Sequence, residues 1–257
     1  MDSVVNTSKI SIDRFLEIAP WPLRPIPWIE NGFYYDGEKY QPAKHPYYFA
    51  GLYYLQEPSA MTPANRLPIE AGDRVLDVCA APGGKSIHLA KAKGGTTKVL
   101  SRDISWEKLE LIEENRVRCH ADNMQIEQWD ACVPDEERKE TADYVLADVP
   151  CSGLGILSRK PDIKYQLTQE RLTELVSLQR KILVNAAKLV KPGGVLVYST
   201  CTINPEENEE NVRRSLTAEA DKRGIFVIQM FYNILLSKPF AEHYGLKTQD
   251  RNRPITP

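Results

Sequence analysis

The stretch that decides the fold is RVLDVCAAPGGK, Arg74–Lys85. Its first five residues form a short, mostly apolar run that predicts a buried strand. The following Gly83 and Gly84 predict a tight turn into a helix that starts at about Lys85. The turn has neither the GxGxxG spacing of dinucleotide sites nor the GxxxxGK[ST] pattern of phosphate loops, and Pro82 stands where a dinucleotide site would have a further glycine. The stretch therefore predicts an α/β unit whose small side chains let a ligand approach the backbone.

The same alternation of strand and helix continues toward the C-terminus. Further strands are predicted at residues 98–101, 123–128, 142–148 and 195–199, and helices at about 85–91, 105–117 and 172–190. The last helix has a stripe at the i, i+3, i+4, i+7 spacing that includes Gln179, and it is expected to stop at the Lys-Pro-Gly-Gly of residues 191–194. Asn204 is expected to cap a helix that starts at Pro205. This order predicts the α/β class, with a doubly wound, mostly parallel sheet.

The N-terminal part of the chain has a different texture. Nine of the 18 prolines lie between Pro20 and Pro68, and tyrosine and tryptophan crowd the same stretch. One short helix is predicted from Ser11, its N-cap, to about Ala19, among short extended pieces. His45 is expected to be a structural residue. The segment is expected to hold little core by itself and to pack against the chain that follows.

These differences divide the chain into three parts. Residues 1–60 are expected to form a small α+β appendage, residues 61–231 the main α/β domain, and residues 232–257 a tail of which at least 248–257 lies loosely on the surface.

Composition excludes several classes of protein. Of the 257 residues, 42% are hydrophobic and 26% charged, which is an ordinary globular balance and argues against disorder. The formal net charge of -2 excludes a globally basic nucleic-acid coat, but not a local basic groove. No apolar run approaches the roughly 20 residues of a membrane span, and the first residues lack the layout of a signal peptide. The five cysteines are expected to be thiols in a reducing cytoplasm, and their spacing predicts no metal site.

Acidic residues follow the second and third predicted strands. Asp103 lies about 20 residues beyond the glycine turn, a position from which a carboxylate can accept hydrogen bonds from a ribose diol. The alternative is that Asp103 only caps the next helix. Asp130 follows the third strand, and its alternative is a surface-loop residue.

Two cysteines follow the last two predicted strands. Cys151 lies in DVPCSGLG, Asp148–Gly155, and Cys201 lies in YSTCT, Tyr198–Thr202. The carboxyl ends of parallel strands meet at one edge of a sheet, so the two thiols can converge on one cleft. The alternative is that each cysteine is a small buried apolar residue. The glutamates that follow are interpreted as acidic residues favoured in the first turn of a helix; they are Glu206, Glu207, Glu209 and Glu210.

These motifs together resemble a known family, the S-adenosylmethionine-dependent RNA cytosine-C5 methyltransferases. The resemblance runs from about residue 4 to about residue 216 and is carried by CAAPGGK, DVPCSG, STCT and PEEN. Within the family, the N-terminal part resembles the bacterial ribosomal RNA enzymes with a small C-terminal RNA-binding domain. CSGLGILSRKPDIKY and TINPEENEENV are more similar to the branch with a helical N-terminal domain. On this resemblance, the first residues are expected to correspond to a position inside the family's N-terminal RNA-binding module, and residues 232–257 do not resemble the family's C-terminal part.

The resemblance implies a Rossmann-like class I methyltransferase fold and a set of site residues. It implies Cys201 as the nucleophile, Cys151 as the residue that acts in release, Asp148 as the partner of the cytosine N3/N4 edge, and Lys85 as a residue that helps to hold the site. The cofactor would be S-adenosylmethionine, with Asp103 on the ribose and Asp130 near the adenine. The residues implied to bind it are Cys79, Ala80, Ala81, Pro82, Gly83, Gly84, Lys85, Asp103, Asp130 and Asp148.

The chemistry explains why two thiols are needed. Carbon 5 of cytosine is a poor nucleophile, and addition of a thiolate to carbon 6 makes it enamine-like. A thiol with a pKa of about 8.5 is only a few per cent ionised near pH 7, so the site is expected to lower the pKa of its nucleophile. Neighbouring chemistries fit less well: amino methyltransferases resemble one another in an Asp/Asn-Pro-Pro-aromatic loop, which is Asp-Val-Pro-Cys here, and DNA cytosine-C5 enzymes lack a Thr-Cys partner.

The expected partner is RNA, with the target cytosine in a single strand or loop because it must leave its stack. Arg159, Lys160 and Lys164 could meet phosphates, or form only a solvated basic turn. The resemblance favours small-subunit ribosomal RNA over transfer RNA. The alternative from another class is a catalytically silent RNA-binding or ribosome-assembly protein on the same fold.

Overall fold

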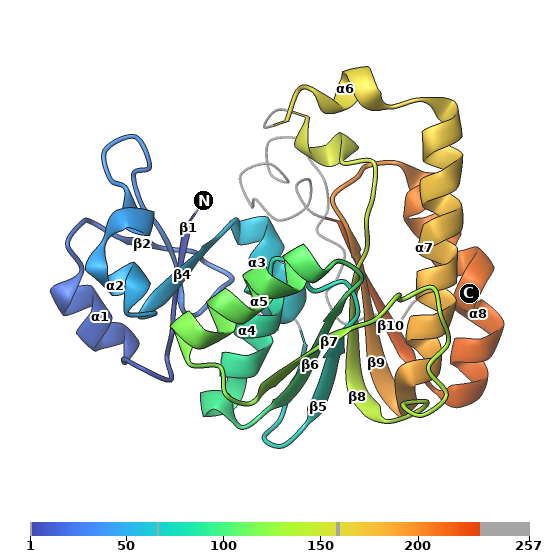
Figure 1. Cartoon of the computed structure of the whole chain (residues 1–257), viewed down its shortest axis with the longest axis horizontal. Helices are drawn as coiled ribbons and strands as arrows, with labels where there is room; N and C mark the ends of the chain where they lie inside the picture. The colour runs from blue at the N-terminus through green and yellow to red at the C-terminus, as the bar shows by residue number, and fades with distance from the viewer. Residues whose placement is uncertain (1, 66, 158–159, 232–257) are drawn as a thin grey trace. The chain divides into compact units, whose positions relative to one another are not determined.

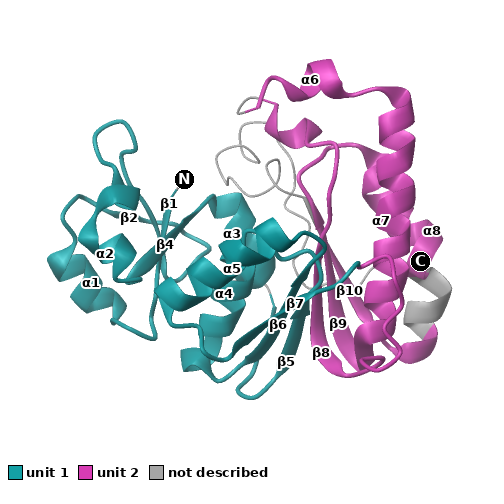
Figure 2. Ribbon diagram, in the orientation of Figure 1, with its two compact units in different colours: residues 1–130 teal, residues 131–257 magenta. Residues whose placement is uncertain are grey.

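The computed structural model describes residues 2–65, 67–157 and 160–231. It falls into two compact units, residues 1–130 and 131–257 (Figure 2). The predicted tail at 232–257 and the candidate RNA contact Arg159 lie outside the described residues. Within the described ranges, no helix combines the length and the apolar character that crossing a bilayer requires.

Unit 1 begins with a four-stranded antiparallel sheet of order β2-β3-β1-β4. Its strands are β1 (Asp2–Val5), β2 (Arg24–Pro25), β3 (Gly32–Tyr34) and β4 (Tyr53–Gln56). The accompanying helices are α1 (Ile12–Ile18), the short 3-10 turn η1 (Pro42–Lys44), α2 (Pro46–Phe49) and α3 (Pro58–Asn65) (Figure 1). Ser11 caps α1, as predicted, because its side chain accepts a hydrogen bond from the Arg14 backbone N–H.

The N-terminal sheet has a core of its own, and the expectation that this segment holds little core is wrong. Val5, Phe15, Trp21, Phe33 and Tyr53 form a buried cluster. The rings of Phe15 and Trp21 meet that of Tyr53 edge to face, with centroids 5.6 and 6.1 Å apart. Each aromatic side chain buries about 150–250 Å². A short, proline-broken segment can therefore still enclose a core when it is rich in aromatic residues.

The same segment also packs against the chain that follows, as expected. The Asn6 side chain donates a hydrogen bond to the carbonyl of Cys119, and the Arg118 guanidinium donates to the carbonyls of Tyr48 and Tyr53. Gly51 makes the closest approach, with a φ of +66°, and a Cβ there would lie 1.9 Å from the Arg118 carbonyl oxygen. Only glycine fits this position, so the sheet and the end of helix α5 form one folded unit.

The second part of unit 1 has three parallel strands in the order β5-β6-β7. They are β5 (Arg74–Asp77), β6 (Lys98–Asp103) and β7 (Met124–Gln128), and between them lie α4 (Gly84–Lys91), the short turn η2 (Ala92–Gly95) and α5 (Trp106–Cys119). Each of these strands and both α-helices occur where the sequence predicts them. Ser105 caps α5, with its side chain accepting from the Lys108 N–H.

Unit 2 repeats the alternation with parallel strands in the order β10-β9-β8. The strands are β8 (Ala142–Asp148), β9 (Val190–Thr200) and β10 (Phe226–Phe231). The helices are the 3-10 turns η3 (Leu154–Ile156) and η4 (Pro205–Glu207), and the α-helices α6 (Ile163–Gln166), α7 (Gln169–Leu189) and α8 (Glu209–Arg223). The predicted α/β class is confirmed: six strands pair in parallel, three in each unit, and strands alternate with helices.

Two element boundaries in unit 2 differ from the prediction. The Lys-Pro-Gly-Gly of residues 191–194 does not separate helix from strand, because α7 ends at Leu189 and β9 begins at Val190. There the register shifts, so that Ala142 pairs with Val190 but Tyr144 pairs with Val195, and the two glycines accommodate the extra residues. After Asn204 the chain forms only the turn η4 before α8 starts at Glu209.

A buried histidine makes the stability of unit 1 depend on pH. His88 lies in α4, burial lowers its pKa from 6.5 to about 4, and it is therefore neutral in the folded protein at pH 7. In the unfolded chain, His88 binds a proton below a pKa of about 6.5, whereas in the folded protein it does so only near pH 4. The stabilising contribution of neutral His88 is therefore fully present above pH 6.5 and is lost as the pH falls toward 4. We predict that the free energy of unfolding falls by about 2 kcal/mol more in the wild type than in His88→Gln between pH 7 and 5.

Chemical denaturation at both pH values measures this difference. The Gln variant is the control because it keeps a buried polar side chain but does not titrate. An equal fall in both proteins would contradict a neutral buried His88.

Candidate functional site

In unit 1, the predicted cofactor residues lie in the turn between β5 and α4 and in the first turn of α4: Cys79, Ala80, Ala81, Pro82 and Gly83 in the turn, and Gly84 and Lys85 in the helix. Asp77 at the end of β5 is fully buried, and its carboxylate accepts a hydrogen bond of 2.7 Å from the Ser86 hydroxyl. The Gly83 N–H closes the turn onto the Ala80 carbonyl at 2.7 Å. Gly83 has a φ of +97°, and a Cβ there would lie 3.3 Å from Ile112. This backbone conformation, together with the close approach of α5, explains the glycine.

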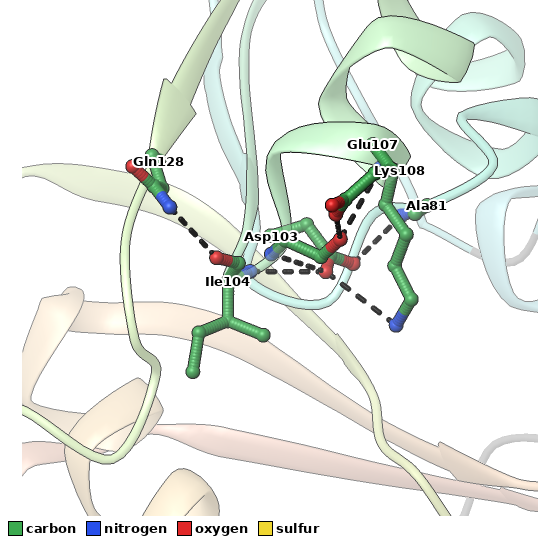
Figure 3. Close-up of polar contacts among 7 residues, drawn as sticks. Ala81, Asp103, Ile104, Glu107, Lys108 and Gln128 are labelled. Atoms are coloured by element: carbon green, nitrogen blue, oxygen red, sulfur yellow. Dashed lines mark hydrogen bonds and ion pairs between the residues drawn. The ribbon is translucent and has the colours of Figure 1, made fainter.

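Asp103 holds this turn in place (Figure 3). Its Oδ2 accepts from the Ala81 N–H at 3.2 Å, and its Oδ1 accepts from the N–H of Ile104 at 2.9 Å and lies 3.6 Å from Lys108 Nζ. Ser105, not Asp103, caps α5, which decides against the helix-cap interpretation. Each carboxylate oxygen has two lone pairs, so Asp103 keeps capacity for further donors.

The segment that carries Asp130 lies beside Asp103. The Trp129 N–H donates to the Asp103 carbonyl at 3.1 Å, and Asp130 follows directly as a half-buried residue. Arg102, which the sequence did not single out, supports this region: its side chain is 1% exposed, pairs with Glu127 at 2.6 Å and lies under the Trp129 ring at 4.8 Å. The structure therefore brings together the glycine turn, Asp103 and the Asp130 segment.

In unit 2, the structure brings the two predicted cysteines into contact. Cys151 follows β8 and Cys201 follows β9, and their sulfur atoms lie 3.1 Å apart. The Cys201 N–H also donates to the Cys151 sulfur at 3.2 Å. Both residues are half-buried. Two thiols at this distance, at the ends of neighbouring parallel strands, are placed to act on one bound group.

Asp148 lies at the end of β8, directly before this loop. Its Oδ1 accepts a hydrogen bond of 2.7 Å from the Ser199 hydroxyl on β9, which fixes the direction of the carboxyl group. Asp148 is half-buried, and so is Lys85 in the first turn of α4 in unit 1. The β8–β9 register pairs Asp148 with Ser199, so both partners are set by backbone pairing.

The contact between the cysteines has an electrostatic consequence. The hydrogen bond with Cys201 and then burial raise the pKa of Cys151 above its ordinary value. Two thiols in contact do not ionise together, because a second negative charge is disfavoured by the first. Cys151 is therefore held as a protonated thiol at neutral pH.

One glutamate differs from its sequence interpretation. Glu207 was expected to be one of several acidic residues in a helix first turn, but it is fully buried and accepts hydrogen bonds from the Ser152 backbone and from the side chain of Gln179. The sequence did contain one signal of this arrangement. Gln179 is a polar residue in the apolar stripe of α7, and a buried amide needs a partner.

The remaining candidates lie at the periphery. Lys160 is exposed, and Lys164 in α6 lies over the Tyr165 ring at 4.7 Å, with Tyr165 77% exposed. His45 accepts a hydrogen bond from the Tyr47 N–H and caps α2, which is the structural role expected for it.

The raised pKa of Cys151 leads to a prediction. Alkylation requires the thiolate, so Cys151 should react with iodoacetamide more slowly than an ordinary thiol at pH 8. Cys201→Ala removes the hydrogen bond with Cys201, which is the largest cause of the raised pKa of Cys151. We therefore predict that Cys151 of this variant is half-alkylated, in a fixed reaction time, at a lower pH than in the wild type. Peptide mapping by mass spectrometry measures each cysteine, and Cys132 serves as the internal reference. An unchanged pH profile would contradict the coupling.

Comparison with known protein families matches nearly all of the described chain. The model of the 16S rRNA methyltransferase RsmB/F family matches residues 64–236, and that of the N-terminal domain of 16S rRNA methyltransferase RsmF matches residues 4–58. The chain is 36% identical over 217 residues to the ribosomal RNA small subunit methyltransferase F of Pectobacterium atrosepticum, which covers 81% of this chain and 45% of that protein. It is 38% identical over 216 residues to the enzyme of the same name from Citrobacter koseri, covering 80% and 44%. The chain thus spans about half the length of these curated relatives.

Solved structures show the same fold. A methyltransferase homologue from Pyrococcus horikoshii is 31% identical with a TM-score of 0.73, and the match covers 84% of this chain and 68% of that one. NSun6 from the same organism has a TM-score of 0.73 at 23% identity, and the match covers 83% of this chain and 78% of that one. At this identity the likeness shows only that the two chains share a fold. With two family models matched over adjoining ranges, the chain belongs to the 16S rRNA methyltransferase RsmB/F family.

Proposed function

We propose that this chain methylates carbon 5 of a cytosine in small-subunit ribosomal RNA, with S-adenosylmethionine as the methyl donor. The observation that carries the proposal is the pair of thiols, Cys151 and Cys201, 3.1 Å apart beside an oriented carboxyl group, Asp148. Family membership supports RNA as the substrate. A methyltransferase acting on an amine or a hydroxyl group would have no use for two adjacent thiols.

Unit 1 has the features that the cofactor needs. The turn between β5 and α4 presents small side chains and the N-terminus of α4, and the left-handed Gly83 keeps its backbone close to α5. Asp103, fixed by Ala81 and Ile104, keeps lone pairs for a ribose diol, and Asp130 follows the strand beside it. Bound there, S-adenosylmethionine would supply an electrophilic methyl group. Cys79 to Lys85 would line its site.

Unit 2 supplies groups for activating the base. Cys201, as a thiolate, adds to carbon 6 of the cytosine and makes carbon 5 nucleophilic. Asp148, oriented by Ser199, holds the N3/N4 edge of the cytosine. After methyl transfer a base takes the carbon-5 proton, and the electrons of that C–H bond restore the carbon 5–carbon 6 double bond and expel the Cys201 sulfur as a thiolate. Cys151, held as a thiol beside the Cys201 sulfur, acts in this release step.

The contact between the two sulfur atoms supports this division of roles. A protonated Cys151 can donate its S–H to the Cys201 sulfur, and a hydrogen bond to the charged form favours that form. The same proton is then available near the leaving sulfur when the adduct breaks down. Lys160, Lys164 and the exposed Tyr165, which follow the Cys151 loop, are proposed to meet RNA phosphates and bases. Residues 1–60 are proposed to cover the cofactor turn and to contact RNA.

The cofactor assignment is tested at Asp103. Asp103→Ala removes a charge-assisted hydrogen bond to the ribose, worth roughly 1.5–3 kcal/mol, and also a partner of the Ala81 N–H. We predict that the affinity for S-adenosylmethionine falls about ten- to a hundredfold. Isothermal titration calorimetry measures it, with Asp122→Ala on the exposed surface as the control. Unchanged affinity would show that the ribose binds elsewhere.

The two cysteines are tested by trapping the covalent adduct. Cys201→Ala should lose both methyl transfer and any adduct, because addition to carbon 6 comes first. Cys151→Ala should still attack the base but release it slowly, so a denaturant-resistant protein–RNA complex should accumulate in the presence of cofactor. The double variant should form none. A denaturing gel with labelled ribosomal and transfer RNA measures all three proteins.

The other outcomes separate the alternative functions. A catalytically silent RNA-binding protein predicts no adduct and no methyl transfer in any form. A DNA-type mechanism predicts that the adduct is lost in Cys151→Ala and kept in Cys201→Ala. If the wild type methylates transfer RNA faster than ribosomal RNA, the proposed reaction stands and the proposed substrate changes to transfer RNA.

A further inference from the structure

We propose that Glu207 is a positioning residue whose buried carboxylate sets the spacing of the two cysteine loops. This inference rests on the proposed function, because it concerns the residues that the reaction would use. From its position in the chain, Glu207 is interpreted only as an acidic residue of a helix first turn, and no step of the proposed chemistry uses it. Its side chain is nonetheless 0% exposed and lies beneath both loops of unit 2.

The carboxylate is held by four hydrogen bonds. One oxygen, Oε2, accepts from the Ser152 N–H at 2.8 Å and from the Gln179 side-chain amide at 2.9 Å. The other oxygen, Oε1, accepts from the Ser152 hydroxyl at 2.5 Å and from the Asn204 side-chain amide at 3.2 Å. All four donors are neutral amides or a hydroxyl. Only a carboxylate offers two acceptor oxygens that can each take two donors.

These partners belong to both cysteine loops. Ser152 directly follows Cys151, and Thr202 directly follows Cys201. The Ser152 and Thr202 hydroxyls lie 2.6 Å apart, and the Asn204 N–H donates to the Thr202 hydroxyl at 3.2 Å. A shift of the carboxylate would therefore move the residue after each thiol. The 3.1 Å separation of the thiols depends on the same contacts.

A second layer keeps the carboxylate itself from moving. Gln179 also donates to the Pro150 carbonyl at 2.9 Å, and its oxygen accepts from the Asn211 side chain at 2.9 Å. The Tyr198 hydroxyl donates to the Glu207 carbonyl at 2.7 Å. A fully satisfied buried network of this kind has one low-energy arrangement, and a network that loses one acceptor has several. Glu207 therefore fixes the loops rather than merely filling space.

The decisive variant is Glu207→Gln, which keeps the shape but replaces one oxygen by an NH₂ group. Placed toward Ser152 N–H and Gln179, the new group faces two donors. Placed on the other side, it meets the Ser152 hydroxyl, which can turn toward Thr202 and accept from the new group, but the Asn204 side-chain amide then loses its acceptor. The first orientation leaves two buried donors without an acceptor, and the second breaks the link to the Asn204 loop and reverses the Ser152 hydroxyl. Glu206→Gln is the matched control, because Glu206 is the preceding residue and its side chain is exposed.

Three quantities are measured on the full chain. The first is the rate of adduct formation with labelled ribosomal RNA, in the Cys151→Ala background with and without Glu207→Gln. The second is kcat for methyl transfer per folded molecule, and the third is the affinity for S-adenosylmethionine. In Glu207→Gln the loops lose hydrogen bonds that position the two thiols. We therefore expect the rate of adduct formation and kcat to fall about ten- to a hundredfold, and the affinity for the cofactor to stay unchanged. Glu206→Gln should match the wild type in all three.

The outcomes separate this proposal from the proposed function. If the wild type forms no adduct and transfers no methyl group, the function is wrong and the positioning role falls with it. If the wild type is active and Glu207→Gln has the same rates per folded molecule, Glu207 is only structural and the inference is overturned. If Glu207→Gln fails to fold, Ser152→Ala decides. It removes the hydroxyl link and keeps the carboxylate, and a slower adduct with unchanged cofactor affinity is expected, whereas unchanged rates would overturn the inference.

Discussion

The parallel pairing of β8 with β9 is the constraint on which the chemistry of unit 2 depends. Its register places Asp148 opposite Ser199, and the two cysteines follow three and two residues later. Because side chains alternate between the faces of a strand, a slip of one residue would turn Asp148 away from Ser199 and separate the thiols. The apolar residues of both strands prevent that slip, since Leu146 and Val197 are completely buried where they pair.

The parts of the fold that the sequence predicts well are those with local causes. The turn after β5, the caps Ser11 and Ser105, and the stripe of α7 each depend on residues close to one another in the chain. Two errors have a common origin in non-local contacts. Helix α7 does end before the glycines, but β9 already begins at Val190, where it pairs with Ala142, and its register jumps across residues 191–194 to Val195. The N-terminal segment was expected to hold little core, but residues of β1, β3, β4, α1 and the loop after α1 meet to form one.

The candidate site divides in the same way. Cys151, Cys201, Asp103 and Asp148 could be named from their motifs because each directly follows a predicted strand or ends one. Glu207 could not, because its importance comes from burial by residues 28 and 55 positions away, Gln179 and Ser152. An acidic residue after Asn-Pro ordinarily lies in water at a helix start. Nothing local distinguishes a glutamate that the fold turns inward from its exposed neighbour Glu206.

A buried acidic group at this place has a physical reason. In the loop that carries Cys151, the Ser152 N–H points inward, away from solvent, to the buried Glu207 carboxylate. Apolar packing would leave that N–H and the amides of Gln179 and Asn204 without acceptors, at a cost of about 1–3 kcal/mol each. A single carboxylate accepts from all of them at once. Loops that carry reactive groups can therefore be held as rigidly as a core, provided that their inward backbone groups share an acceptor, and the arrangement around Glu207 meets that condition.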